Sequence, residues 1–164
     1  MGTPFTQVYN RFLGKITDDM YMELTPEDTV RDLRNLLIAA IPEFEFPRVD
    51  LFDYTIVETE NALEEESSFT ADLSSEEINI LAILMMIGWT QRQITSIENT
   101  RMKYSGSDFK FTSQANHLSK LLNLLAETQR QSHHMQRLYK RRRFDENGKY
   151  ESNWSVLRDN SALD

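Results

Sequence analysis

Four consecutive cations, Lys140 to Arg143, are the residues of this chain with the clearest capacity for chemistry. Guanidinium and ammonium groups bind carboxylates and phosphates. One or two of the four would offset the dipole of a helix that ends here. The others are free to bind an acidic protein surface or the phosphates of DNA, with a solvated face as the third interpretation. Arg130, Arg137 and Tyr139 extend the segment, and the acidity of the whole chain favours protein over DNA.

No other group of residues forms a catalytic or metal-binding pattern. The chain has no cysteine and no glycine-rich phosphate loop. His133 and His134 are adjacent, so on a helix they point about 100° apart and cannot easily share one ion. His117 has no acidic residue near it, and the carboxylates of Asp18–Asp19 and Glu64–Glu66 are typical of solvated loops. We therefore expect no catalytic residue, no metal and no cofactor.

The C-terminal segment 144–164 carries apolar residues with no helical or strand period. A tryptophan in a polar tail is often an anchor for another chain. The alternative is that it folds back on its own domain. We predict an extended arm, with Asn147-Gly148 as a turn signal. The anchors predicted within it are Phe144, Tyr150, Trp154, Val156 and Leu157.

The charges of the chain divide into three parts. Residues 1–100 contain 6 Lys/Arg and 19 Asp/Glu, a net of −13, whereas residues 101–143 have a net of +8 and residues 144–164 a net of −3. Such asymmetry can orient identical subunits or steer a charged partner. An unevenly charged solvated surface is the simpler alternative.

The elements that position these residues are mostly helices. Thr3 and Pro4 predict the start of a first helix, which a left-handed Gly14 would end. Thr25-Pro26 predicts the start of a second, which Pro42 stops. Between residues 43 and 69 the helical period fails, and we expect an acidic, irregular insertion with one short hairpin at most.

Two long helices follow. Ser74 and Glu77 have the spacing of a capping box, so we expect a helix over 75–103 that is buried nearly all round from Ile78 to Trp89. The last helix is predicted over 113–143, and its polar half beyond Ala126 is expected to project from the core or to pack on another chain. Its apolar stripe is predicted to be Leu118, Leu121, Leu122 and Leu125.

These elements predict a mainly α protein, a small helical bundle over residues 1–143 with an acidic loop near 43–69 and an extended arm over 144–164. No signal peptide or membrane span is visible, and the absence of cysteine suits a reducing cytoplasm. The expected function is non-catalytic binding of other proteins.

Three stretches carry a resemblance to a known family. They are residues 12–21 (FLGKITDDMY), residues 73–85 beginning LSSEE, and residues 139–143 (YKRRR) with the tail that follows. In these stretches and in the order of its helices the chain resembles the head–tail connector proteins of tailed bacteriophages, also called neck or adaptor proteins. It departs from many adaptors in its long acidic stretch, residues 43–68.

The resemblance implies a helical subunit of the virion neck, assembled in the bacterial cytoplasm as a homo-oligomeric ring on the portal protein. Further neck or tail proteins would bind the ring, and double-stranded DNA would pass through it. The alternative function is a DNA-binding or regulatory protein that uses the basic helix 130–143. The resemblance implies that the basic helix end and the arm contact the portal protein. The residues predicted for this contact are Arg137, Lys140, Arg141, Arg142, Arg143, Phe144, Tyr150, Trp154, Val156 and Leu157.

Overall fold

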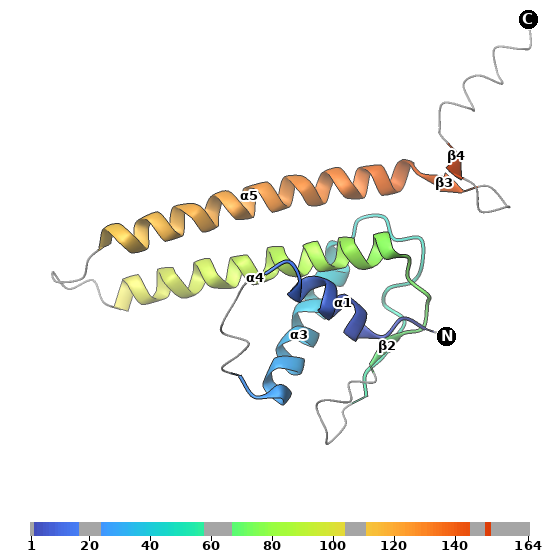
Figure 1. Ribbon diagram of the computed structural model, residues 1–164, viewed down its shortest axis with the longest axis horizontal. Helices are drawn as coiled ribbons and strands as arrows, with labels where there is room; N and C mark the ends of the chain where they lie inside the picture. Colours follow the sequence, from blue (N-terminus) through green and yellow to red (C-terminus); the bar gives the residue numbers. More distant parts are fainter. Residues whose placement is uncertain (1, 17–23, 58–66, 104–110, 145–149, 152–164) are drawn as a thin grey trace, which may run out of the picture.

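The structure is a computed structural model, and it describes residues 2–16, 24–57, 67–103, 111–144 and 150–151. The chain is mainly α-helical, as the sequence predicts (Figure 1). The elements in chain order are α1 (Phe5–Leu13), α3 (Pro26–Ala40), the 3₁₀ helix η1 (Ile41–Glu43), β1 (Tyr54–Thr55), β2 (Ser68–Phe69), α4 (Ser75–Lys103), α5 (Phe111–Arg141), β3 (Arg143–Phe144) and β4 (Tyr150–Glu151).

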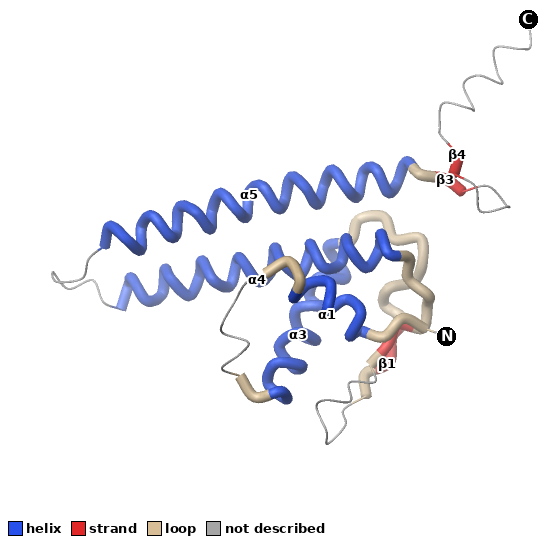
Figure 2. The backbone as a smooth tube through the Cα atoms, in the orientation of Figure 1, coloured by secondary structure: helices blue, strands red, loops and turns tan. Residues whose placement is uncertain are grey.

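The two long helices organise the fold. α4 and α5 lie side by side and antiparallel, and α1 and α3 pack against the N-terminal half of α4 (Figure 1). Figure 2 shows the loop between η1 and β1 running beside the N-terminal end of α4. The C-terminal half of α4 and the N-terminal half of α5 extend beyond this body as a two-helix projection.

The core surrounds the first half of α4. Ile80 to Met85 are all buried, which confirms the prediction for that part of the helix, while Met86 to Trp89 are partly exposed. On α1 the buried face includes Phe5, whose ring centroid is 4.7 Å from that of Phe69. Burial on all sides follows from the near-continuous apolar sequence of this stretch.

Two predicted helix starts are confirmed. Thr25 caps α3, because its hydroxyl oxygen accepts the N–H of Asp28 at 3.2 Å. Ser74 and Glu77 form the capping box of α4: the Ser74 hydroxyl accepts the Glu77 N–H at 3.3 Å, and the Glu77 carboxylate accepts the Ser74 N–H at 2.7 Å. Each bond satisfies a backbone donor that the first turn leaves without a partner.

The predictions for both ends of α1 are wrong. Thr3 does not cap the helix, because its hydroxyl accepts the N–H of Leu73 at 2.7 Å, and Pro4 occupies the cap position. Gly14 is not left-handed, since its φ is −69° and its ψ −9°. The helix ends in a right-handed turn closed by the Lys15 N–H on the Phe12 carbonyl at 2.8 Å.

The last helix reverses the predicted distribution of burial. Its polar half beyond Ala126 is the half that packs on the body, with Thr128, Ser132, Gln136 and Tyr139 buried. The leucine-rich half lies in the projection, where α4 is the only described element beside it. Leu121 is buried there, but Leu122 is 48% exposed. The prediction that the polar half projects is therefore wrong.

Two short hairpins complete the fold. Tyr54 pairs with Phe69 in the β1–β2 hairpin, which confirms the short hairpin expected in the acidic insertion. Phe144 pairs with Tyr150 in the β3–β4 hairpin, so the start of the predicted arm has strand structure that the sequence pattern did not predict. Residues 58–66, the middle of the predicted acidic loop, and residues 145–149 and 152–164, most of the predicted arm, lie outside the described residues.

Replacing Leu81 with Ala tests the buried helix. Leu81 is fully buried, so Leu81→Ala should lower the free energy of unfolding by about 2–5 kcal/mol. Leu122→Ala is the matched control on the projection and should cost less than about 1 kcal/mol. Urea unfolding followed by circular dichroism measures both, and equal costs would contradict the burial of Leu81 on α4 and the exposure of Leu122 on α5.

Candidate partner-binding surface at the end of α5

The C-terminal end of α5 is fixed by a buried tyrosine. Tyr139 is 1% exposed, and its hydroxyl donates a hydrogen bond to the carboxylate of Glu77 in the first turn of α4. Burial, and next the hydrogen bond to Glu77, raise the pKa of Tyr139 well above its ordinary value. The basic end of α5 therefore has a fixed position against the start of α4.

Arg48, from the loop after η1, closes the end of the helix. Its guanidinium donates to the backbone carbonyls of Tyr139, at 2.7 Å, and of Arg142. It also lies 4.3 Å from the centroid of the Tyr139 ring, within cation–π range. The last carbonyls of a helix have no partner inside the helix, so a positive donor there caps it and offsets its dipole.

Gln136, one turn before, holds the same loop. It is 1% exposed, and its side-chain oxygen accepts the N–H of Glu45 at 2.7 Å. Its amide nitrogen donates to the Ser132 hydroxyl at 3.2 Å and to the Glu43 carbonyl at 3.4 Å. Nearby, His133 Nδ1 is 3.2 Å from the Glu45 carboxylate. A fully bonded buried amide of this kind specifies one register between α5 and the loop.

The structure divides the predicted basic cluster into cations that contact other side chains of their own chain and cations that do not. Arg142 pairs with Glu76 at 2.8 Å, and the Lys140 ammonium lies 3.9 Å from the centroid of the Phe46 ring. These two cations contact their own chain. Arg141 is exposed and makes no such contact with the described residues, and Arg137, also exposed, donates only to the His133 carbonyl at 3.2 Å. Arg137 and Arg141 are thus the members available to a partner.

The remaining predicted anchors fall partly or wholly outside the described residues. Arg143, Phe144 and Tyr150 are described only as backbone, in strands β3 and β4. Trp154, Val156 and Leu157 are not described at all. Their binding to a partner stays a prediction.

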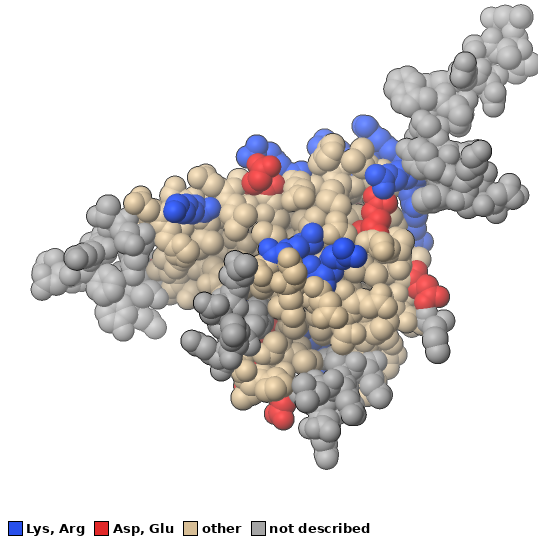
Figure 3. All heavy atoms as spheres, in the orientation of Figure 1, with Lys and Arg blue, Asp and Glu red and all other residues tan. Residues whose placement is uncertain are grey.

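Exposed apolar side chains near this end were missed by sequence reasoning. Phe52, in the loop held by Gln136 and Arg48, is 67% exposed, and Phe46 and Leu138 are each more than a third exposed. Large exposed aromatics are typical anchors of protein interfaces. The sequence shows phenylalanines in an acidic stretch without a helical period. That pattern does not indicate which of their side chains are exposed. Figure 3 shows Lys and Arg along α5 toward this end.

The groups considered for chemistry do not converge. Within the described ranges, no three His, Cys, Asp or Glu side chains are close enough to hold a metal ion. His117, His133 and His134 are all exposed. Asp18–Asp19 and Glu64–Glu66 lie outside the described residues. None of the helices in the described part of the chain has the length and apolarity to cross a bilayer.

Comparison with protein-family models, with curated proteins and with solved structures gives no match for this chain.

Tyr139→Phe tests the bond to Glu77. The substitution keeps the ring and removes a donor to a buried carboxylate, so it should lower the free energy of unfolding by about 1.5–3 kcal/mol. Because the pKa of Tyr139 is raised in the folded state, this contribution is complete below the ordinary tyrosine pKa near 10 and is lost as the pH rises above it. Urea unfolding at pH 7 and at pH 10–11 measures the difference.

Tyr54→Phe is the matched control, because the Tyr54 ring packs in the Phe5–Phe69 cluster and its hydroxyl has no hydrogen bond to the described residues. It should be nearly neutral at both pH values. A Tyr139→Phe variant as stable as the wild type, or a stability difference that persists unchanged at high pH, would contradict the assignment.

Proposed function

We propose that this chain is a structural virion protein, a head–tail connector subunit that forms a ring on the portal protein of a tailed bacteriophage. The ring helps to join head and tail, and DNA passes through it. The proposal rests on the three sequence stretches that resemble adaptor proteins and on the end of α5. It makes the chain a protein-binding subunit and not an enzyme.

The observation that carries the proposal is the arrangement of cations at the end of α5. Arg48 and Arg142 hold the helix in place, whereas the exposed side chains of Arg137 and Arg141 are available to other molecules. They are four residues apart and so lie on one face of a rigid helix. The C-terminal arm continues from the same end, so cations and arm would bind one partner together.

Charge also supports a ring of identical subunits. The first 100 residues carry a net charge of −13, and the basic residues are concentrated in α5 and the segments that flank it. A heterologous contact joins two different surfaces of the same protein, and such contacts close into rings. The acidic body of one subunit and the basic helix of the next are complementary surfaces for this contact.

A second candidate function is DNA binding by the helix 130–143. Arg137 and Arg141 on one face could neutralise neighbouring phosphates. Arg130 is less available, because it pairs with Glu127 at 3.2 Å. The net charge of −8 disfavours DNA and places this function second.

Charge reversal at Arg137 and Arg141 distinguishes the two functions. Arg137→Glu with Arg141→Glu should weaken co-sedimentation with the portal protein of the same virus by at least about tenfold, since charged contacts at an interface are worth 1.4 kcal/mol or more. Retention on heparin should not change. Arg31→Glu with Lys120→Glu is the control, because both cations are exposed, lie elsewhere and give the same change in net charge. Intact portal binding with lost heparin retention would favour the DNA-binding function instead.

Deleting residues 144–164 tests the arm. Every buried core residue of the described chain lies before this segment, so the truncated chain should stay helical and melt close to the wild type. It should fail to co-sediment with the portal, and Trp154→Ala alone should cost about 2 kcal/mol of binding. Full binding by the truncated chain would exclude the arm as the portal contact, and a much lower melting temperature would make it part of the fold.

A further inference from the structure

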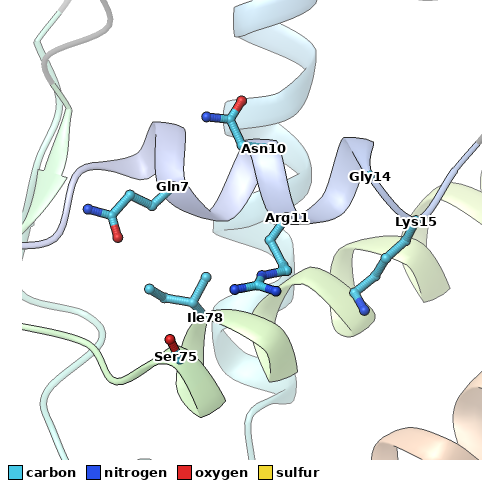
Figure 4. A pocket seen from close by; sticks show the side chains of 7 residues that line it. All are labelled: Gln7, Asn10, Arg11, Gly14, Lys15, Ser75 and Ile78. Atoms are coloured by element: carbon cyan, nitrogen blue, oxygen red, sulfur yellow. The ribbon is translucent and has the colours of Figure 1, made fainter.

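A second polar surface lies on the opposite side of α4's first turn from Tyr139. It is an open hollow of about 620 Å³ between α1 and the start of α4. Figure 4 shows the side chains of Gln7, Arg11 and Lys15 on the side of α1 that faces Ser75 and Ile78, whereas Asn10 points away. Gln7 and Arg11 are four residues apart on α1, and Lys15 follows in the right-handed turn that ends the helix, so the three form one polar row beside the hollow.

The two cations of this row repel each other. Partial burial, and next the charge of Arg11, lower the pKa of Lys15. Among the residues that the structure describes, no carboxylate pairs with either cation. The hollow therefore holds two positive charges whose mutual repulsion this part of the chain does not offset.

The other cations of the first 100 residues are engaged. Arg92 pairs with Asp32 at 2.6 Å, and Arg31 pairs with Asp28. Arg48 binds the end of α5, and Arg34 is not free either. Arg11 and Lys15 differ from these cations, because no described carboxylate pairs with them. A negative group from outside the described chain would compensate them.

We propose that the hollow between α1 and α4 binds a phosphate group, held by Arg11 and Lys15 with the side-chain amide of Gln7 as a further donor. A guanidinium presents paired N–H donors that match two phosphate oxygens, and an ammonium adds a point charge. A phosphate monoester carries −1.5 to −2 charges near pH 7, and two neighbouring phosphates of DNA carry one negative charge each, so either matches two adjacent cations better than one carboxylate does. The attraction for a phosphate comes from Arg11 and Lys15 and not from the start of α4, because the first turn of α4 carries the carboxylates of Glu76 and Glu77.

The volume of the hollow is in the range of small-molecule sites. The phosphate could belong to a small phosphorylated molecule or to the DNA backbone. The second source rests on the proposed function, in which DNA passes through the ring. Both sources require the same chemistry from Arg11 and Lys15, and the experiment separates them.

The test is a titration of the full chain with inorganic phosphate at constant pH and ionic strength, followed by amide chemical shifts. Saturable shifts are expected in residues 7–15 and 75–78. Arg11→Gln with Lys15→Gln should weaken binding at least about tenfold, because each lost charge-assisted hydrogen bond is worth more than a factor of ten. Arg31→Gln with Lys120→Gln removes the same net charge elsewhere and should leave the affinity unchanged.

A second titration with a short DNA duplex identifies the source. Duplex binding that the Arg11/Lys15 variant loses points to the backbone, and phosphate binding without duplex binding points to a small ligand. Absence of saturable shifts for both probes, or equal weakening in the control, would overturn the proposal. If the double variant does not fold, Lys15→Gln alone gives the same comparison. Portal co-sedimentation of the Arg11/Lys15 variant is independent of these outcomes, so failure of the hollow and failure of the connector function are distinguishable.

Discussion

The carboxylate of Glu77 lies where the start of α4 meets the end of α5, and it is 4% exposed. A buried carboxylate costs several kcal/mol unless donors replace the lost water. Here three donors do so, the N–H and hydroxyl of Ser74 and the hydroxyl of Tyr139. The bond that starts α4 and the bond that positions α5 therefore share one acceptor. Because that acceptor is fixed by its own helix, the position of α5 along α4 is fixed as well.

The loop after η1 depends on this register. Tyr139 and Gln136 are one turn apart on α5, and once Tyr139 is placed, Gln136 meets the backbone of Glu43 and Glu45 while Arg48 reaches the last carbonyls of the helix. This explains why the polar half of α5 is buried: its polar groups have specific partners, so their burial satisfies them. The leucine-rich half lies beyond the body, and α4 is the only element of the described chain beside it, which leaves Leu122 half exposed.

The helices and the N-terminal caps of α3 and α4 were predictable because their signals are local. The Ser74–Glu77 and Thr25–Asp28 bonds connect residues three apart, and the apolar run before Met85 is continuous. The contacts of Tyr139 with Glu77 and of Gln136 with Glu45 span 62 and 91 residues, and no periodicity encodes them. Thr3 failed as a predicted cap for the same reason, since a distant N–H takes its hydroxyl. In the candidate surface, the basic cluster was visible in the sequence, but only tertiary contacts separate Arg142 and Lys140 from Arg137 and Arg141.

The first turn of α4 connects the two surfaces that could bind negative groups. Ser75 and Ile78 line the hollow beside Arg11, whereas Glu76 and Glu77 bond to Arg142 and Tyr139. Residues three apart lie on one side of a helix and those between them on the other, so a single turn separates the hollow from the end of α5. The turn is rigid, because the capping box satisfies its free donors and the buried run of α4 follows it. The distance between the two surfaces is therefore set by backbone geometry, and the two proposed contacts would use different residues.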